Sequence, residues 1–469
     1  MRVLLVSSNQ ERRPYPVAPL GICLLAERLR ERHEVKVFDG MFEDPSSLRA
    51  TVEAFEPDAV GLGVRNIEDP VMERHRSYLD DVLHSFVRPI RASTSAPLVL
   101  GGSGFSLFPD QMLARFEADF GLVGEAEQSL PNLIDDLESG ARTARDGAQA
   151  LESESIDVGL GELEIGPSKI ERWIDFSSYQ ARSTYPVQTK RGCARRCIYC
   201  NYPSIEGSTF RLRSPDAIVA EIAEVSERFD GAVTFEIVDS VFNAPPGHAE
   251  AICRALIARN LGVKLRAMGI NPKGLTTELL SLMQRAGFVQ IHCSPDTASP
   301  AMLSRMGKGF SREALEAAAI NIREAGMPTM WFMLIGGPGE TEETFRETLD
   351  FTDRFVDPVD MVDFWAGLRI YPRTDLHARS VGEGVVDRDD DLFEPRYYVS
   401  AELGRARCKQ LIEEACVSRP NCVPAWDAAP DPQMLREAFA LRKKLQAQEP
   451  MFRTLIRLRR ERMSDRAHL

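Results

Sequence analysis

Short apolar runs alternate with helical patterns along the first 140 residues of the chain. The runs lie at residues 3–6, 35–38, 59–64, 98–100 and 120–123. Continuous apolar runs of this length are typical of parallel strands covered on both faces. The pattern predicts an α/β fold for residues 1–140, a doubly wound domain of the flavodoxin-like or Rossmann-like kind. Ligands of such sheets bind outside the carboxyl ends of the strands.

A second strand–helix series occupies residues 183–375. Its predicted strands lie at residues 187–189, 233–238, 263–268, 289–293, 329–335 and 361–371. Ser214, Pro215 and Asp216 together indicate a helix start, and Gly287 and Gly326 stand where helices are expected to end. Six successive units of this kind predict a partial (β/α)6 barrel, with its active site at the carboxyl ends of the strands.

The remaining segments have weaker patterns. Residues 141–182 lose their periodicity and are rich in acidic and small residues, which predicts a linker. Residues 376–469 form a charged and mostly helical region in this interpretation. Its basic amphipathic stretch at 434–463 is expected to be a solvated helix packed on the barrel.

The net charge of the chain indicates which kinds of molecule it binds. The chain has 469 residues and a formal net charge of −13, which argues against nucleic-acid binding and favours a small molecule or a protein. The amino terminus is apolar over only a few residues, too few for a signal peptide or a membrane span. We therefore expect a cytoplasmic protein without membrane contact, whose nine cysteines are mostly reduced.

Three cysteines carry the strongest chemical signal. Cys193, Cys197 and Cys200 follow the first predicted barrel strand in a C-x3-C-x2-C spacing. Zinc sites close with four ligands, usually as two distant pairs, and ordinary ferredoxin clusters take four cysteines. Three thiolates on an iron–sulfur cluster leave one iron open, and the basic residues around them favour thiolates. We expect no second cluster from Cys408, Cys416 and Cys422, whose spacing matches no known arrangement.

This spacing, with Tyr199 just before the last cysteine, resembles the signature of the radical SAM superfamily. The resemblance implies a 4Fe-4S cluster whose open iron chelates S-adenosylmethionine. An electron from the cluster then cleaves that cofactor to a 5'-deoxyadenosyl radical, and a reducing partner such as flavodoxin or ferredoxin supplies the electron.

Further positions match the S-adenosylmethionine site of that superfamily. They are Gly336 and Gly337 in the turn after the fifth strand, Glu236 and Asp239 for the amino group, and Arg266 and Asp296 for the ribose and carboxylate. The segment from Ser294 to Ser299 departs from the glutamate–serine form common there. The alternative for the carboxylates is a solvent-facing or loop-capping position.

The amino-terminal domain narrows the resemblance to the cobalamin-binding radical SAM subfamily. The residues that carry it are Gly101, Gly102, Ser103 and Gly104, together with Gly124 and Glu125. A doubly wound domain alone more often binds a nucleotide or flavin, so the pairing with the radical SAM core is what indicates cobalamin. In that subfamily the corrin lies between the two domains, with its nucleotide tail on the glycine-rich side.

Many cobalamin proteins carry a D-x-H-x-x-G motif whose histidine ligates cobalt, and residues 1–140 lack it. Arg65 and Asn66 instead follow the third strand, where they are expected to face the corrin. A guanidinium has donors but no free lone pair, so Arg65 would leave cobalt without a protein ligand, as in the tryptophan 2-methyltransferase branch. The alternative is that Arg65 forms a surface ion pair.

The resemblance predicts a cobalamin-dependent radical SAM methyltransferase of natural product biosynthesis. It would transfer a methyl group from S-adenosylmethionine, through methylcobalamin, to a carbon of a small metabolite or peptide. One alternative is a rearrangement, ring contraction or cyclisation without methyl transfer, and another is a non-catalytic cobalamin or cluster sensor. Trp331 and Trp365 are expected to pack in the core rather than line a pocket.

Overall fold

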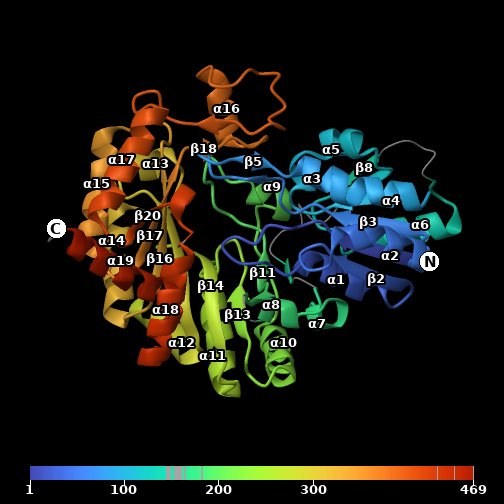
Figure 1. Ribbon diagram of the computed structural model, residues 1–469, viewed down its shortest axis with the longest axis horizontal. Coiled ribbons are helices and arrows are strands. Elements are labelled where there is room, and N and C mark those ends of the chain that lie inside the picture. The colour runs from blue at the N-terminus through green and yellow to red at the C-terminus, as the bar shows by residue number, and fades with distance from the viewer. Residues whose placement is uncertain are drawn as a thin grey trace.

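The chain folds into two α/β units that lie side by side (Figure 1). The computed structural model describes residues 1–143, 149–152, 161–162, 165–180, 183–429, 431–447 and 449–467. The amino-terminal unit, blue to cyan in Figure 1, faces a larger unit that runs from green to red.

The amino-terminal unit is built on a six-stranded parallel sheet in the order β2-β1-β3-β6-β7-β8. Its strands are β1 (Arg2–Ser7), β2 (Glu34–Asp39), β3 (Ala59–Gly63), β6 (Leu98–Gly101), β7 (Phe120–Val123) and β8 (Gln149–Glu152). The main helices are α1 (Leu20–Leu29), α2 (Leu48–Phe55), α4 (Arg88–Ser93), α5 (Pro109–Phe116) and α6 (Ser129–Ser139). This order is the flavodoxin-like one, so the predicted doubly wound class is confirmed. Strand β8 lies within the range predicted as a linker.

Both faces of this sheet are buried, as the uninterrupted apolar runs predict. Along β1, Val3 and Leu5 pack in one apolar cluster, while Leu4 and Val6 pack in another on the opposite side of the sheet. Successive side chains of a strand point to opposite faces, so a strand covered twice must be apolar at every position.

The larger unit is a curved seven-stranded parallel sheet in the order β10-β13-β14-β15-β16-β17-β20. Its strands are β10 (Tyr185–Val187), β13 (Thr234–Ile237), β14 (Lys264–Ile270), β15 (Phe288–Asp296), β16 (Thr329–Ile335), β17 (Met361–Ala366) and β20 (Cys422–Pro424). Helices α10 (Pro215–Arg228), α11 (His248–Arg259), α12 (Thr277–Ala286), α14 (Arg312–Ala325), α15 (Glu342–Phe355) and α17 (Arg405–Ser418) cover it. The six predicted strands are present. The seventh, β20, comes from the region predicted as mostly helical.

The helix ends follow the predicted signals with one correction. Gly287 ends α12 at a φ of 104°, and a Cβ there would lie 2.1 Å from the carbonyl oxygen of Val263, so only glycine fits. Ser214 precedes α10, but its side chain makes no capping hydrogen bond. The start of α10 is therefore set by Pro215 and by the acidic Asp216 in the first turn.

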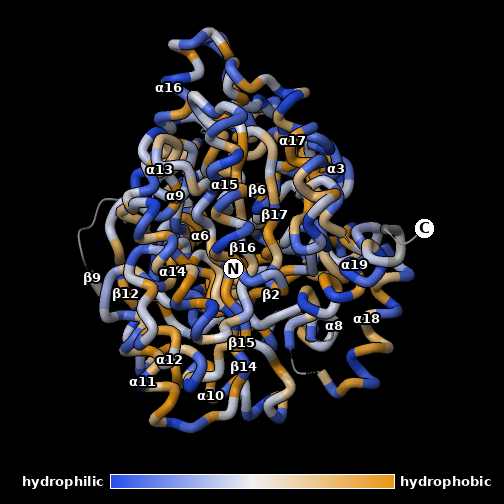
Figure 2. The backbone as a smooth tube through the Cα atoms, turned by 90° about the vertical axis from the view of Figure 1, so that its left-hand side faces the viewer, coloured by the Kyte–Doolittle hydropathy of each residue, from blue (hydrophilic) through white to orange (hydrophobic). Residues whose placement is uncertain are grey.

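The strands of this unit present one apolar face to the helices and a mixed face to the interior. Trp331 on β16 is buried against Phe351 of α15, with 5.8 Å between ring centroids, whereas the neighbouring Phe332 is only half-buried. Figure 2 shows the same contrast along the helices, whose tubes alternate between hydrophilic and hydrophobic colours. Trp331 therefore packs in the core as predicted. The second tryptophan, Trp365, is half-buried.

Helix α19 (Met451–Ala467) of the carboxyl-terminal region packs beside the amino-terminal ends of β16 and β17. Helices α18 (Pro432–Leu445) and α19 pack on each other. Arg453 of α19 lies 2.6 Å from the buried carboxylate of Asp360, which in turn accepts a hydrogen bond from the backbone of Thr329 at 3.2 Å. The basic stretch is thus packed against the barrel, as predicted. The remaining helix of this region, α16 (Asp375–Gly382), stands apart at the opposite end (Figure 1).

Candidate functional site

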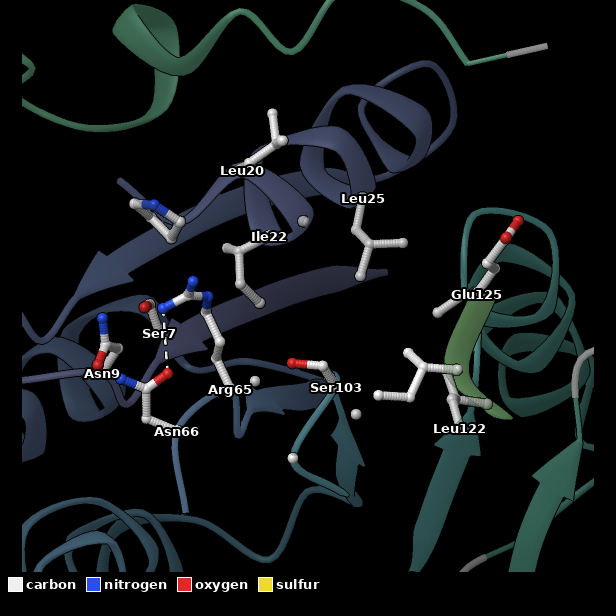
Figure 3. Close-up of a pocket in the computed structure, with 18 of the residues that line it drawn as sticks. Ser7, Asn9, Leu20, Ile22, Leu25, Arg65, Asn66, Ser103, Leu122 and Glu125 are labelled. Atoms are coloured by element: carbon white, nitrogen blue, oxygen red, sulfur yellow. Dashed lines mark hydrogen bonds between the residues drawn. The ribbon is translucent and has the colours of Figure 1, made fainter. Parts of the chain in front are cut away.

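A cavity of about 600 Å³ lies where the carboxyl ends of the first sheet face the second unit. The first sheet contributes Ser7, Asn9, Arg65, Asn66, Gly101, Gly102, Ser103, Gly104, Gly124 and Glu125, and the second unit contributes Gln188, Arg191, Asn201, Tyr202, Glu206 and Tyr371. Figure 3 shows Arg65, Asn66 and Ser103 beneath Ile22 and Leu25 of α1. The predicted glycine-rich residues are therefore gathered at one surface between the two units.

The glycine-rich loop is pressed against the end of β3. Gly102 has a φ of 100°, and a Cβ there would lie 2.7 Å from the carbonyl oxygen of Val64. A Cβ at Gly104 would lie 2.7 Å from the carbonyl oxygen of Arg65. The small residues thus allow one backbone to rest directly on the other and leave the cavity above them open.

The side chain of Arg65 extends into the cavity beside Asn66 (Figure 3). Its Nη1 donates a hydrogen bond to Asn66 Oδ1 at 3.0 Å. Burial lowers the pKa of Arg65, while Tyr202 and Tyr15 raise it. In the part of the chain that the structure describes, Arg65 forms no salt bridge, so the surface ion pair considered as its alternative is absent.

Buried ion pairs join the two units at the edge of the cavity. Arg191 lies 3.0 Å from Glu125 and also pairs with Glu127, and Arg211 donates to Glu125 at 2.8 Å. All four side chains are largely buried. Glu125, predicted as a cofactor contact, therefore has the two arginines as its partners here, and it holds the units together.

Glu206 brings a titratable carboxyl group to the same cavity. It accepts a hydrogen bond from the backbone of Gly192 at 3.4 Å and another from Gln188 Nε2 at 3.4 Å. Burial raises the pKa of Glu206 to about 7, although Arg191 lowers it. The carboxyl group is thus partly protonated near neutral pH.

Replacing Glu206 with glutamine is expected to flatten the pH dependence of stability. The native carboxyl binds a proton up to about pH 7, whereas the ordinary pKa is 4.5, so the native state holds more protons between these values. The free energy of unfolding should therefore fall as pH rises from 4.5 to 7, by up to about 3 kcal/mol. Urea unfolding of the wild type and Glu206→Gln at pH 5 and pH 8 measures this. An equal change in the free energy of unfolding between pH 5 and pH 8 in the two proteins would contradict this expectation.

The three cysteines lie on one loop that follows β11 (Lys190–Arg191). The backbone of Cys193 donates to Gly207 at 3.1 Å, and that of Ile198 donates to Met306 at 3.2 Å. A Cβ at Gly307 would lie 2.3 Å from the carbonyl oxygen of Arg196. The loop is therefore held between helix α9 (Tyr202–Glu206) and the segment that follows helix α13 (Pro300–Arg305).

The chemistry of these thiols fits an iron–sulfur cluster. Burial, with smaller contributions from the nearby Cys197 and Cys193, raises the pKa of Cys200 to about 12, so the three sulfurs are neighbours. Burial also raises the pKa of Cys197, so it outweighs the basic residues that were expected to favour the thiolates. Within the described ranges, no three Cys, His or carboxylate side chains converge as the ligands of a single ion do. A cubane cluster takes each thiolate at a different iron, so it suits thiols that are close without sharing one point.

Tyr199 ties the cysteine loop to the end of β15. Its hydroxyl hydrogen-bonds to the carboxylate of Asp296, and Lys308 Nζ lies 3.1 Å from the same hydroxyl. Burial lowers the pKa of Lys308, but the carboxylate of Asp296 outweighs this and raises it. Asp296, predicted to contact S-adenosylmethionine, thus neutralises Lys308 beside the cysteines. Its ligand role stays a prediction.

The two predicted amino-group ligands already have protein partners. Asp239 is buried, accepts from the backbone of Thr189 at 2.7 Å and pairs with Lys190 at 3.0 Å. Glu236 accepts hydrogen bonds from Tyr15 at 2.8 Å and from Thr184 at 3.0 Å. Asp239 therefore anchors the approach to the cysteine loop, and Glu236 lies inside the barrel.

The remaining residues predicted to contact S-adenosylmethionine, Arg266 and the glycine pair, lie at different depths of the barrel. Arg266 lies within β14, with its Nη2 3.3 Å from Glu236. Gly336 and Gly337 form the turn after β16, where Gly336 has a φ of 104° and a Cβ on Gly337 would lie 2.9 Å from Met302. The backbone N–H of Gly336 donates a hydrogen bond to the buried carboxyl group of Glu340 at 3.4 Å. Burial raises the pKa of Glu340 to about 7.

Several site residues carried no signal in the sequence pattern. Tyr15 reaches from the loop before α1 to Glu236, and Tyr202 and Glu206 belong to the short helix after the cysteines. Lys308 lies between Gly307 and Gly309, and that glycine pair was the one available hint of a tight, specific loop.

The two units match two known domain families. The B12 binding domain matches residues 11–134, and the radical SAM superfamily matches residues 187–352. The fold and site thus define a radical SAM enzyme with a cobalamin-binding domain. Residues 11–134 thus form a B12 binding domain and residues 187–352 a radical SAM domain, and this pair of domains confirms the expected cofactors: a 4Fe-4S cluster, S-adenosylmethionine and cobalamin.

Similar proteins include a tryptophan 2-C-methyltransferase of Streptomyces laurentii, 24% identical over 81% of this chain and 74% of that protein. An uncharacterised methyltransferase of Pyrococcus horikoshii is 22% identical over 84% of this chain and 87% of its own. Among solved structures, the methyltransferase TsrM from Kitasatospora setae, with cobalamin and a 4Fe-4S cluster bound, superimposes with a TM-score of 0.81. It is 23% identical and covers 100% of this chain and 99% of that one, so it supports the shared fold.

Proposed function

We propose that this protein is a cobalamin-dependent radical SAM methyltransferase acting on a carbon of a small metabolite. The methyl group would pass from S-adenosylmethionine to the cobalamin and from there to the substrate. The similar proteins named as methyltransferases support this, because their matches span 81% and 84% of this chain. A cytoplasmic location and a flavodoxin or ferredoxin as electron donor stay predictions.

The observation that carries the proposal is a shared cavity wall. Asn201 and Tyr202, directly after Cys200, line the same cavity as Arg65 and Ser103 of the B12 binding domain. A cluster on the cysteine loop and a corrin on the glycine-rich loops would therefore face each other across one cavity. A shared cavity of this kind would position the reactants next to each other.

The residues present suit both groups. Cys193, Cys197 and Cys200 would hold the cluster, and the turn at Gly336 and Gly337 would let S-adenosylmethionine approach the backbone closely. The loops at Gly101–Gly104 and Gly124 would receive the corrin and its tail, with Arg65 and Asn66 facing the metal. Cobalamin supplies a methyl carrier when bound, and the chain supplies a cavity that orients the reactants.

The test is anaerobic reconstitution with iron, sulfide and cobalamin, followed by S-adenosylmethionine labelled in its methyl group. We expect the label on cobalamin and, with substrate present, a product heavier by one methyl group. A product of unchanged mass would instead support the rearrangement alternative. Absence of label on cobalamin in fully loaded protein would contradict the proposal, and absence of S-adenosylmethionine turnover would favour a sensor.

Replacing Arg65 with histidine is expected to change the absorbance spectrum of bound cobalamin. Imidazole offers a lone pair to cobalt, whereas a guanidinium does not. A new ligand stabilises the six-coordinate alkyl form, so label transfer to substrate should slow by about tenfold or more. Arg65→Lys is the control, since a protonated amine also lacks a lone pair and should leave the spectrum unchanged. An unaltered spectrum in Arg65→His would show that Arg65 does not face the metal.

A further inference from the structure

The cysteine loop has an exposed, positively charged part between two of its three cysteines. Ala194 and Arg196, between Cys193 and Cys197, are exposed, and Arg195 is half-buried. A cluster held by these cysteines would lie next to this part of the surface. Electron transfer between proteins slows steeply with distance, so a protein that reduces the cluster has a short path here.

The end of α13 and the residues after it extend this surface. The backbone of Ile198 donates to Met306 at 3.2 Å, so this segment lies against the cysteine loop. Arg305 and Gly309 of the segment are exposed. A Cβ on Gly309 would lie 3.8 Å from Arg195 Nη1, so the guanidinium of Arg195 lies beside Gly309. Arginines from two segments of the chain thus share one surface.

In the part of the chain that the structure describes, no carboxylate pairs with Arg195, Arg196 or Arg305. Arg305 Nη1 donates instead to the carbonyl oxygen of Gly339 at 2.7 Å. Burial lowers the pKa of Arg195, and two cysteine thiols of the loop raise it. A guanidinium stays protonated in proteins, so the three side chains offer their positive charge to a partner.

Arginines on other exposed faces are paired. Arg346 lies 2.8 Å from Glu342, and Arg254 lies 3.4 Å from Glu278. The chain has 70 acidic and 57 basic residues, so the three arginines form a local positive surface on a negative protein. Charge of this kind speeds the encounter with an acidic partner and orients it.

The start of α16 borders this surface and brings a carboxylate to its edge. The backbone of Leu376 donates to the carbonyl oxygen of Ile198 at 2.8 Å. Asp375, next to Leu376, is exposed and pairs with none of the three arginines. Three cations beside this carboxylate leave the surface positive.

We propose that the arginine face, made of Ala194, Arg195, Arg196, Arg305 and Gly309, is the docking surface for an acidic flavodoxin that reduces the cluster. Carboxylates of the flavodoxin pair with the arginines, and the small side chains of the face let the edge of the flavin come close. Electron-transfer complexes bury less than about 1,200 Å², so a few charges can define one. The assignment rests on the proposed function and adds the place where its electron donor binds.

One electron passes across this face. The anionic hydroquinone of the flavin gives up the electron and becomes the neutral semiquinone, and the cluster takes the electron. No proton moves in this step, and no further reactant is needed.

The test uses the reconstituted protein and an acidic flavodoxin reduced to its hydroquinone. The absorbance of the flavin measures how fast the protein oxidises it. We expect the rate to fall by about tenfold between about 50 mM and about 500 mM salt, because salt screens charges at the surface. A rate that salt does not change overturns the inference. Flavodoxin that stays reduced, beside protein that photoreduced deazaflavin does reduce, overturns it as well.

Arg196→Glu reverses one charge of the face, and the native side chain has no hydrogen bond or ion pair within the described residues to lose. Its reduction by flavodoxin at low salt should slow at least about fivefold, since charges at the rim of an interface control encounter. Photoreduced deazaflavin, a small uncharged reductant, should reduce the variant and the wild type equally. Arg254→Glu, at an exposed position of α11, is the matched control and should change neither rate. Equal flavodoxin rates in Arg196→Glu and the wild type overturn the inference.

Arg196→Lys keeps the charge and adds an amine at the same place. It should keep the rate with flavodoxin, and a carbodiimide, which joins amines to carboxylates, should link the flavodoxin to position 196. Mass spectrometry of the linked peptides identifies the position. Absence of a link at position 196 overturns the assignment, even where Arg196→Glu does not fold.

Failure of this inference differs from failure of the proposed function. Wild-type protein that places labelled methyl on cobalamin, but whose reduction by flavodoxin does not depend on salt or on Arg196, keeps the proposed function and removes the docking surface. Wild-type protein that flavodoxin reduces in a salt-dependent way, but that places no label on cobalamin, keeps the docking surface and removes the proposed function.

Discussion

Replacing Cys197 with alanine is expected to abolish cluster assembly and all methyl transfer to substrate. The loop offers three thiolates for three irons, and no other cysteine takes part in it. Of the remaining described cysteines, Cys23, Cys253, Cys293, Cys408, Cys416 and Cys422 are all buried elsewhere. Two thiolates cannot hold a cubane that already has one open iron. Iron and sulfide content after reconstitution, and the absorbance of the cluster, measure the loss.

Cys253→Ala is the matched control for this variant. Cys253 is buried on α11 among apolar side chains, and its pKa is raised to about 12 by burial, so it behaves as a small apolar residue. The control should keep full iron content and lose only some stability. Cobalamin uptake should survive in Cys197→Ala, because the glycine-rich loops belong to the other domain. Full iron content in Cys197→Ala would contradict the assignment of the cluster.

Replacing Gly102 with alanine is expected to lower cobalamin uptake by at least about tenfold. The added Cβ would lie 2.7 Å from the carbonyl oxygen and 3.1 Å from the carbonyl carbon of Val64. Both atoms are backbone, so the end of β3 must move, and with it Arg65 and Asn66 on the cavity surface. A displacement of this kind costs about 1–3 kcal/mol, which corresponds to about a tenfold or larger loss of affinity.

Gly140→Ala separates this collision from backbone strain. Gly140 ends α6 with a φ of 73°, and a Cβ there would meet no atom within 4 Å. Both variants therefore force alanine into a left-handed conformation, but only Gly102→Ala collides with the cavity wall. Cobalamin bound after gel filtration is read from its absorbance. Equal losses in the two variants would show that strain alone, and not the cavity surface, explains the effect.

The predicted strands of the first sheet could be found because parallel strands buried on both faces need apolar residues at every position, and those of the larger unit because their outward face is apolar. The runs at residues 120–123 and 329–335 coincide with β7 and β16. Strands β8 and β20 were missed. Each has only three or four residues and lies at a sheet edge, where one neighbour suffices and the apolar requirement weakens.

The sequence analysis named individual residues of the candidate site but did not predict which charged side chains pair with them. Glu125 and Asp296 were expected to meet ligands, and the structure gives them arginine and lysine partners from distant segments. Such pairs form between residues 86 and 12 positions apart in the chain, and no local pattern encodes which charges meet. The same reasoning applies to Tyr15, which reaches Glu236 across 221 positions.

The amino-acid sequence by itself determined the series of strands along each unit in outline, the three thiols and the glycine-rich turns, because these depend on residue type and local spacing. Only the tertiary structure decided that Asn201 and Arg65 line one cavity and that Arg266 of β14 pairs with Glu236 of β13. Those neighbours come from different strands and different domains. Their meeting depends on the curvature of one sheet and the packing of two, which are properties of the whole folded chain.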